Sequence, residues 1–338
     1  DIESLPFIES VRQLRWELGR DCLCVHLTYV PFIAAAKEYK TKPTQHSVKE
    51  LQSEGIQPDI LVLRTEHPLS AALCKKVANF CNVSPDAVFQ SPDMPSIYQV
   101  PVCMQDQGID RVILEKLGLP VGATPELGPW RSFLDRRANA TEELHIGLVG
   151  KYDLQDAYKS IIEALQQAGV YNDRKVRCHF INSENITREN VGEMLEGMAG
   201  YVICGTEGKL IATQYCREHD LPTFGICLGM QMMVIEFARN VLGYKDANST
   251  ELNSKTTHNV IDIMEEQKNI TNMGGTMRLG AYDCVLKKGS KLYQAFGKEL
   301  VQQRHRHRFE FNSEYKATFD AAGMKCVGEN PDTGLVEA

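Results

Sequence analysis

Apolar segments of strand length alternate with amphipathic segments of helical spacing through the first third of the chain. The helical segments cover residues 6–18, 46–54 and 70–81, and the strand-like segments cover 22–30 and 59–63. Such alternation is typical of a parallel sheet that is flanked by helices. We therefore predict an α/β domain over residues 1–119.

The alternation lapses over residues 120–143, a stretch rich in Gly, Pro and charge that we interpret as an interdomain linker with a short helix at 130–137. It resumes in a second predicted domain, residues 144–338, with a helix over 156–167 and strands over 145–149, 176–181, 200–204 and 223–226. The last strand leads into a helix with one apolar face, which indicates core packing and carries Met230, Met233, Val234, Phe237 and Val241. Both domains are predicted to be α/β, doubly wound, with mainly parallel sheets.

Composition narrows the kind of protein. A length of 338 residues favours two domains, and a net charge of -7 argues against broad nucleic-acid binding, which needs an excess of Lys and Arg. The 11 scattered cysteines form no CxxC pair, so we expect reduced thiols in a cytoplasmic protein rather than a zinc site. No apolar run approaches the roughly 20 residues of a membrane span, so we expect no membrane contact.

The most informative stretch is Pro222–Gln231, with the sequence PTFGICLGMQ. It predicts a strand, a sharp turn at Cys227 and a helix, with Gly225 and Gly229 two residues to either side. Glycine suits such a turn because neighbouring backbone comes too close for a β-carbon. A cysteine at a helix N-terminus is favoured as the reactive thiolate. A lone cysteine is more often inert, so the case for catalysis at Cys227 depends on the whole motif.

The GICLGMQ string is similar to the nucleophile motif of class I glutamine amidotransferases. Several further segments resemble CTP synthases, in the right order and across both domains: DIESLPF from residue 1, KTKPTQHS from 40, GKY from 150, DAYKS from 156, DANSTE from 246, GGTMRLG from 274 and RHRHRFE from 304. The resemblance implies that the first domain is part of an amidoligase related to P-loop and dethiobiotin-synthetase folds. It implies a class I glutamine amidotransferase domain for the second.

The resemblance also implies which residues bind glutamine. Cys227 would attack the glutamine side-chain amide, with the backbone N–H of Leu228 facing the developing oxyanion. Glu251 would take the α-ammonium group and Arg308 the α-carboxylate. We expect Arg308 to share one face of a strand with Arg304 and Arg306. The complete predicted glutamine site is Leu228, Gly229, Met230, Gln231, Glu251 and Arg308.

Nucleotide sites are implied in the first domain. The UTP site, whose triphosphate region inhibitory CTP would share, is predicted at Lys40, Thr41, Lys42, Pro43, Thr44, Gln45 and Lys76, in a loop that Pro43 stiffens. CTP would also reach Asp1, Ile2 and Glu3. Met94 falls where the family contacts the adenine of ATP, although the local sequence PDM departs from the usual pattern. On the residues alone, an ordinary exposed basic loop is the better explanation of Lys40 to Gln45, and the nucleotide site depends on the resemblance.

Three pieces of the family pattern are not found. The P-loop and the acidic ligands of Mg²⁺ would precede Asp1, and the HPE segment that completes the Cys triad would follow Ala338. Cys204 runs directly into Gly205, where the family has a Gly-rich loop, PGGFGxRG, that supplies a second oxyanion donor. We therefore expect this sequence to be part of a longer enzyme. An intact mass near 38.0 kDa would instead show a complete chain, for which we expect neither glutaminase nor ligase activity.

The implied reaction is the ATP-dependent amination of UTP to CTP. The resemblance adds GTP as an allosteric activator, a homotetramer and possible filaments, with no organic cofactor. It also suggests Arg278 as part of a loop that moves over the glutamine site and senses GTP. Two alternatives stay open at this point: an amidotransferase that acts on a purine nucleotide, and a catalytically silent polymer-forming or regulatory homologue.

Overall fold

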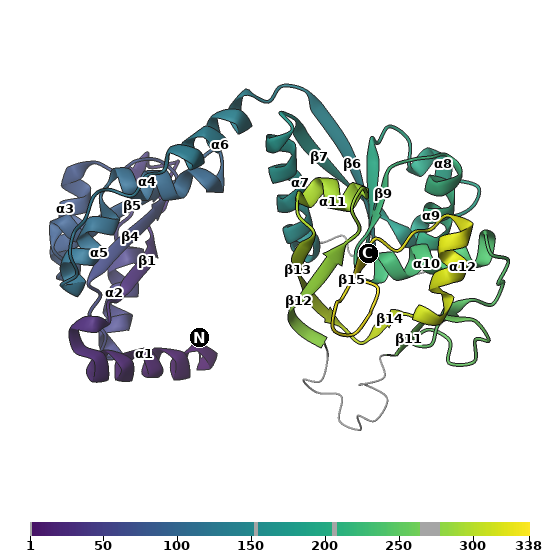
Figure 1. Ribbon diagram of the computed structural model, residues 1–338. Helices are drawn as coiled ribbons and strands as arrows, with labels where there is room; N and C mark the ends of the chain where they lie inside the picture. Colours follow the sequence, from purple (N-terminus) through teal and green to yellow (C-terminus); the bar gives the residue numbers. More distant parts are fainter. Residues whose placement is uncertain (1, 152–154, 205–207, 264–277) are drawn as a thin grey trace. The chain divides into compact units, whose positions relative to one another are not determined.

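The computed structural model describes residues 2–151, 155–204, 208–263 and 278–338 (Figure 1). The chain divides into two compact units, Asp1–Ala138 and Asn139–Ala338. None of the helices described is both long and apolar enough to span a lipid bilayer.

The first unit is built on a three-stranded parallel sheet in the order β1-β4-β5, with β1 at Val25–Tyr29, β4 at Ile60–Thr65 and β5 at Val88–Pro92. A hairpin of β2 (Phe32–Ile33) and β3 (Glu38–Tyr39) follows β1. The helices are α1 (Leu5–Leu18), α2 (Lys42–Ser53), α3 (Ala71–Cys81), α4 (Val100–Asp106) and α5 (Ile109–Leu117). β4 supplies the centre of the core, because Ile60, Leu61 and Leu63 have no exposed surface.

The predicted linker contains a longer helix than expected, α6 (Gly128–Asn139). The indole Nε1 of Trp130 donates a hydrogen bond to the backbone oxygen of Tyr98 at 2.7 Å, and Phe133 packs edge-on against the Tyr98 ring. These contacts attach α6 to the first unit. The finer division into residues 1–119, 120–143 and 144–338 stays a prediction.

The second unit has a four-stranded parallel sheet in the order β7-β6-β8-β9. Its strands are β6 (Glu143–Gly150), β7 (Lys175–Asn182), β8 (Gly200–Cys204) and β9 (Thr223–Gly225). Figure 1 shows α7 (Lys159–Tyr171) on one side of this sheet, with α9 (Gly208–Glu218) and α10 (Leu228–Asn240) on the other. The short α8 (Val191–Met194) packs against α9. The prediction of α/β units with parallel sheets is confirmed.

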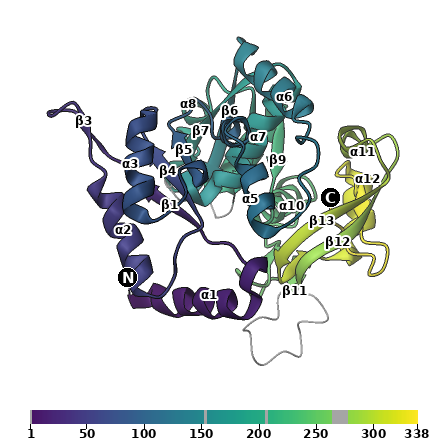
Figure 2. The ribbon, with the colours of Figure 1, turned by 90° about the vertical axis from the view of Figure 1, so that its left-hand side faces the viewer.

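Two smaller sheets complete the second unit, and the sequence pattern did not reveal them. One has the order β10-β11-β14, with β10 at Asn248–Ser249, β11 at Asn259–Ile263 and β14 at Phe309–Phe311. The other has the order β13-β12-β15, with β12 at Arg278–Leu286, β13 at Leu300–His307 and β15 at Gly328–Glu329. β12 and β13 run side by side as an antiparallel pair (Figure 2). The helices α11 (Lys291–Phe296) and α12 (Lys316–Ala322) lie among these strands in the chain.

Two local predictions were wrong. The segment from Lys42 to Gln45 is not a loop, because α2 begins at Lys42. Pro43 occupies the first turn, where its missing N–H is not needed and its fixed φ suits the helix. Arg308 does not share a strand with Arg304 and Arg306, because β13 ends at His307 and β14 begins at Phe309.

Candidate active site

The predicted nucleophile lies at the corner between β9 and α10. Cys227 is exposed and has φ 54° and ψ -112°, a positive-φ conformation that costs a residue with a β-carbon about 1–3 kcal/mol. Such strain persists only where the surrounding structure enforces it, and it is concentrated at functional sites. The turn predicted from the glycine spacing is confirmed.

The two flanking glycines show what enforces the turn. A β-carbon on Gly229 would lie 1.8 Å from the backbone oxygen of Ile203, at the end of β8. On Gly225 it would lie 2.6 Å from the sulfur of Met233 and 2.7 Å from the backbone nitrogen of Met230. The first turn of α10 is therefore pressed directly onto the strand ends, and no larger residue fits.

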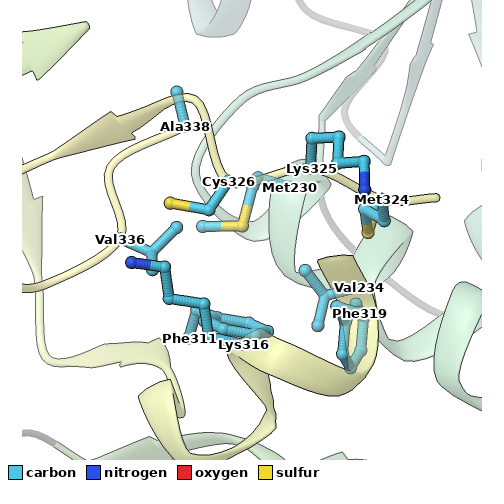
Figure 3. Close-up of a pocket in the computed structure, with 10 residues that line it drawn as sticks. All are labelled: Met230, Val234, Phe311, Lys316, Phe319, Met324, Lys325, Cys326, Val336 and Ala338. Carbon is cyan, nitrogen blue, oxygen red and sulfur yellow. The ribbon is translucent and has the colours of Figure 1, made fainter. Parts of the chain in front are cut away.

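Among the predicted glutamine-binding residues, Leu228 starts α10, so its N–H is one of the amides that a helix leaves without an intrahelical acceptor. The side chain of Met230 goes elsewhere. It lines an apolar cavity of about 140 Å³ with Val234, Cys326 and Val336 (Figure 3). Met230 therefore contributes its side chain to packing, as the apolar face of its helix predicts, and its place in the glutamine site stays a prediction.

Gln231 is only 5% exposed. Its Nε2 donates to the backbone oxygen of Phe309 at 3.1 Å. This hydrogen bond connects α10, the helix that follows Cys227, to β14. Its Oε1 is buried and accepts no hydrogen bond from any residue that the structure describes. A buried acceptor of this kind is costly unless something pairs with it.

The two predicted charged residues lie next to strands that pack against α10. Glu251 follows β10 by two residues, and its backbone N–H donates to Ser249 Oγ at 3.2 Å. Arg308 follows β13 and directly precedes Phe309, whose carbonyl is bonded to Gln231. Because β10 and β14 both pack against α10, the fold brings these two segments to the helix that carries Cys227.

A buried ionic cluster beside Arg308 was missed at the sequence level. Arg278 is 7% exposed, and its guanidinium donates to Glu310 at 3.0 Å and to Glu337 at 2.8 Å. Its Cζ also lies 4.2 Å from the centre of the Tyr282 ring. Arg278 is thus the first residue of a strand and is held in the interior. This geometry does not resemble a mobile loop, although Gly274 to Met277 lie outside the described residues.

The histidines of the RHRHR segment complete this cluster. His307 Nε2 donates to Glu310 at 2.6 Å, and His305 Nε2 lies 2.9 Å from a carboxylate oxygen of Glu337. Burial, reinforced by the positive charge of Arg278, lowers the pKa of His305 to about 4, so this imidazole is neutral near pH 7. Burial also raises the pKa of Glu337.

The predicted nucleotide residues of the first unit lie after the carboxyl end of β1, the edge of a parallel sheet where ligands commonly bind. Lys40 and Lys42 are exposed, and Lys40 forms an ion pair with Glu38. Thr44 is fully buried and its hydroxyl donates to the backbone oxygen of Tyr29 at 3.0 Å. Its side chain is therefore structural. Gln45 Nε2 donates to the Thr41 hydroxyl at 3.1 Å.

The remaining nucleotide predictions are spread over other elements. Lys76 is exposed on α3, and Met94 follows β5 at the same carboxyl edge of the sheet. Pro43 is exposed in the first turn of α2. Ile2 and Glu3 form a short 3-10 helix with Ser4, and Asp1 lies outside the described residues.

The segment that resembles a shortened Gly-rich loop falls partly outside the described residues, at 205–207. Next to it, Lys209 is fully buried and its ammonium group donates to the backbone oxygen of Cys204. Burial lowers the pKa of Lys209 to about 8. Over the described ranges, no three His, Cys, Asp or Glu side chains are grouped so that they could hold a metal ion.

Two family models match the chain. Residues 1–119 match the CTP synthase N-terminus, and residues 153–338 match the class I glutamine amidotransferases. Among solved structures, the chain is similar to a Trypanosoma brucei CTPS glutaminase domain with bound acivicin. The TM-score is 0.51 and the identity 32%, over 57% of this chain and 78% of that one.

Curated relatives match this chain over its whole length. The chain is 69% identical to a CTP synthase of Bacteroides thetaiotaomicron and 64% identical to one of Porphyromonas gingivalis, in each case over the whole of this chain and 64% of the relative. Each alignment covers 345 positions, seven more than the 338 residues of this chain. At least seven positions of these relatives therefore have no counterpart within the aligned region. The glutamine amidotransferase model covers more than half of the chain, so the chain belongs to the class I glutamine amidotransferases, and its first unit matches the model of the CTP synthase N-terminus.

Proposed function

We propose that the protein is a glutamine-hydrolysing ligase that converts UTP to CTP at the expense of ATP. The observation that carries the proposal is the strained, exposed Cys227 at the N-terminus of α10, in a chain that matches both the amidotransferase model and the CTP synthase N-terminus. Since the chain spans 64% of the length of its curated relatives, the activity of the whole protein is inferred from this combination.

The glutaminase half-reaction follows from the position of Cys227 at the turn between β9 and α10. The Cys227 thiolate attacks the side-chain amide carbon of glutamine, and the N–H of Leu228 donates to the oxyanion that forms. The C–N bond then breaks, ammonia leaves with a proton, and a glutamyl thioester remains on sulfur. Water hydrolyses the thioester to glutamate and restores the thiol. Glu251 and Arg308 would hold the α-ammonium and α-carboxylate groups.

The synthetase half-reaction uses the first unit. ATP phosphorylates O4 of UTP, which turns a poor leaving oxygen into phosphate. Ammonia adds at C4, phosphate leaves, and CTP forms. Lys40, Lys42 and Lys76 would neutralise the triphosphate, and Met94 would lie near the adenine. The described residues offer no grouped ligands for the Mg²⁺ that accompanies ATP, so no step is assigned to that ion.

Regulation and assembly follow the family. We propose feedback inhibition by CTP at the triphosphate subsite, activation of glutamine hydrolysis by GTP, a homotetramer and a cytoplasmic location. These properties rest on the CTP synthase resemblance rather than on any contact in the chain.

Isotope transfer tests the proposed function. Glutamine labelled with ¹⁵N in its side-chain amide should yield CTP labelled at the C4 amino group when UTP, ATP and Mg²⁺ are present. Mass spectrometry of the nucleotide reads the result. CTP that stays unlabelled while glutamate accumulates would contradict the transfer, and an absence of CTP with either glutamine or ammonia would contradict the ligase assignment.

A further inference from the structure

Arg308 lies at a junction between two sheets. β13 ends at His307 and belongs to the sheet β13-β12-β15, whereas β14 starts at Phe309 and belongs to β10-β11-β14. Arg308 is therefore the single residue at which the backbone passes from one sheet to the other. Its orientation depends on how the two sheets are held together at this point.

Glu310 joins the two sheets across the junction. It belongs to β14, where it is opposite Asp262, yet its Oε1 accepts hydrogen bonds from His307 Nε2 at 2.6 Å and from Arg278 Nη1 at 3.0 Å. Those two donors are cross-strand partners on β13 and β12. The hydrogen bond between Glu310 and His307 therefore links the chain on the two sides of Arg308.

The contacts of Glu310 with Arg278 and His307 hold the junction firmly because they are buried. The side chains of Arg278 and Glu310 are each 6% exposed, so neither charge is screened by water. A second carboxylate, Glu337, holds the other side of the guanidinium at 2.8 Å. On the opposite flank, Gln231 holds the Phe309 carbonyl and thereby connects the junction to the helix of Cys227.

We propose that Glu310 is a positioning residue that aims Arg308 at the α-carboxylate of glutamine, and so makes the Cys227 site selective for a free amino acid. This inference rests on the proposed function and deepens it. Glu310 acts through Arg308 and does not touch the substrate. Its loss should therefore weaken recognition of the α-carboxylate and leave the intrinsic reactivity of Cys227 in place.

Two alkylating agents separate these effects. Acivicin carries an α-amino acid group, whereas iodoacetamide reacts with thiols without one. In the intact protein, Glu310→Gln should lower the rate constant for acivicin labelling of Cys227 about tenfold or more, since a charge-assisted contact weakens. The iodoacetamide rate at Cys227 should change less than about twofold. Glu329→Gln, which alters a half-buried glutamate of β15 that is paired with Lys316 in the same unit, is the matched control.

A double variant tests whether Glu310 acts through Arg308. In an Arg308→Ala background, Glu310→Gln should cause no further loss of acivicin labelling, because coupled residues are not additive. Unchanged acivicin selectivity in Glu310→Gln would overturn the inference, as would an equal fall in both rates. A wild-type protein whose labelling glutamine does not slow would instead contradict the proposed function.

Discussion

Cys227 combines exposure with strain, two properties that an inert thiol does not require. Burial raises the pKa of Cys284 and of Cys326 to about 11, which disfavours the thiolate at both positions. Reactivity should therefore be concentrated at one position of the eleven cysteines.

Replacing the nucleophile should separate the two half-reactions. Cys227→Ala is expected to lower glutamine-dependent CTP formation by about a thousandfold or more, because no other group can form the thioester. Ammonia-dependent CTP formation should stay within about twofold of the wild type. Steady-state assays with glutamine or ammonium chloride check both statements, with Cys178→Ala as the control. Glutamine-dependent turnover in Cys227→Ala would show that the nucleophile is misassigned.

Lys40 tests the nucleotide prediction at the same scale. Its ion pair with Glu38 is exposed and contributes little to stability, so a triphosphate can replace the carboxylate without structural loss. Lys40→Ala should raise the KM for UTP about tenfold and leave glutamine hydrolysis in the absence of UTP unchanged. Lys49→Ala, an exposed lysine on α2, serves as the control. An unaltered KM for UTP in Lys40→Ala would remove Lys40 from the site.

At the scale of elements, the active site depends on how closely α10 approaches the end of β8. Gly229→Ala would place a β-carbon against the Ile203 carbonyl at 1.8 Å, so the helix must move. We expect a loss of about 1–3 kcal/mol in the free energy of unfolding and a loss of glutaminase activity. Urea denaturation and glutamine hydrolysis measure the two effects. Gly122→Ala, which would meet nothing within 4 Å, should be neutral. Equal behaviour of both variants would contradict the packing argument.

The sequence predicted β1 and β4 of the first parallel sheet and all four strands of the second, because their apolar runs are clear, but it missed β5 at Val88–Pro92. It also predicted the Cys227 corner, since the glycines at ±2 have a steric reason that the structure confirms. It placed Arg308 in a strand because an alternating RHRHR pattern does not show where one sheet ends and another begins. Likewise, Pro43 suggested a loop, although proline also suits the first turn of a helix.

The buried cluster around Glu310 could not be predicted from local pattern. Arg278, Glu310 and Glu337 are up to 59 residues apart in the sequence and meet only because β12, β14 and the segment after β15 converge. The Met230 side chain lines the apolar cavity, as the apolar face of its helix predicts. The motif indicates which residues surround the nucleophile, whereas the helix period decides which of them face the core.

At the scale of the whole molecule, the buried cluster should influence acid stability. The pKa of His305 is lowered to about 4 from the usual 6.5, mainly by burial, with Arg278 and His307 also disfavouring its charge and Glu310 opposing them. Glu337 lies 2.9 Å from the ring as well. Between pH 6.5 and 4 the unfolded state binds a proton that the folded state does not, so this residue makes the protein less stable as the pH falls.

His305→Gln should therefore reduce the acid sensitivity. The free energy of unfolding of the wild type minus that of the variant should fall as the pH drops from about 6.5 toward 4, and should be constant above pH 7.5. Urea denaturation at a series of pH values gives this difference. A difference that does not change with pH would show that His305 titrates normally in the folded protein.

The central claim is that Cys227 attacks the side-chain amide of glutamine, and labelling with acivicin tests it most directly. The intact protein should gain one adduct per chain, located on Cys227 by peptide mass spectrometry, and millimolar glutamine should slow the labelling. Cys227→Ser should gain no adduct. An unlabelled Cys227, or adducts distributed over the other cysteines and unaffected by glutamine, would contradict the account.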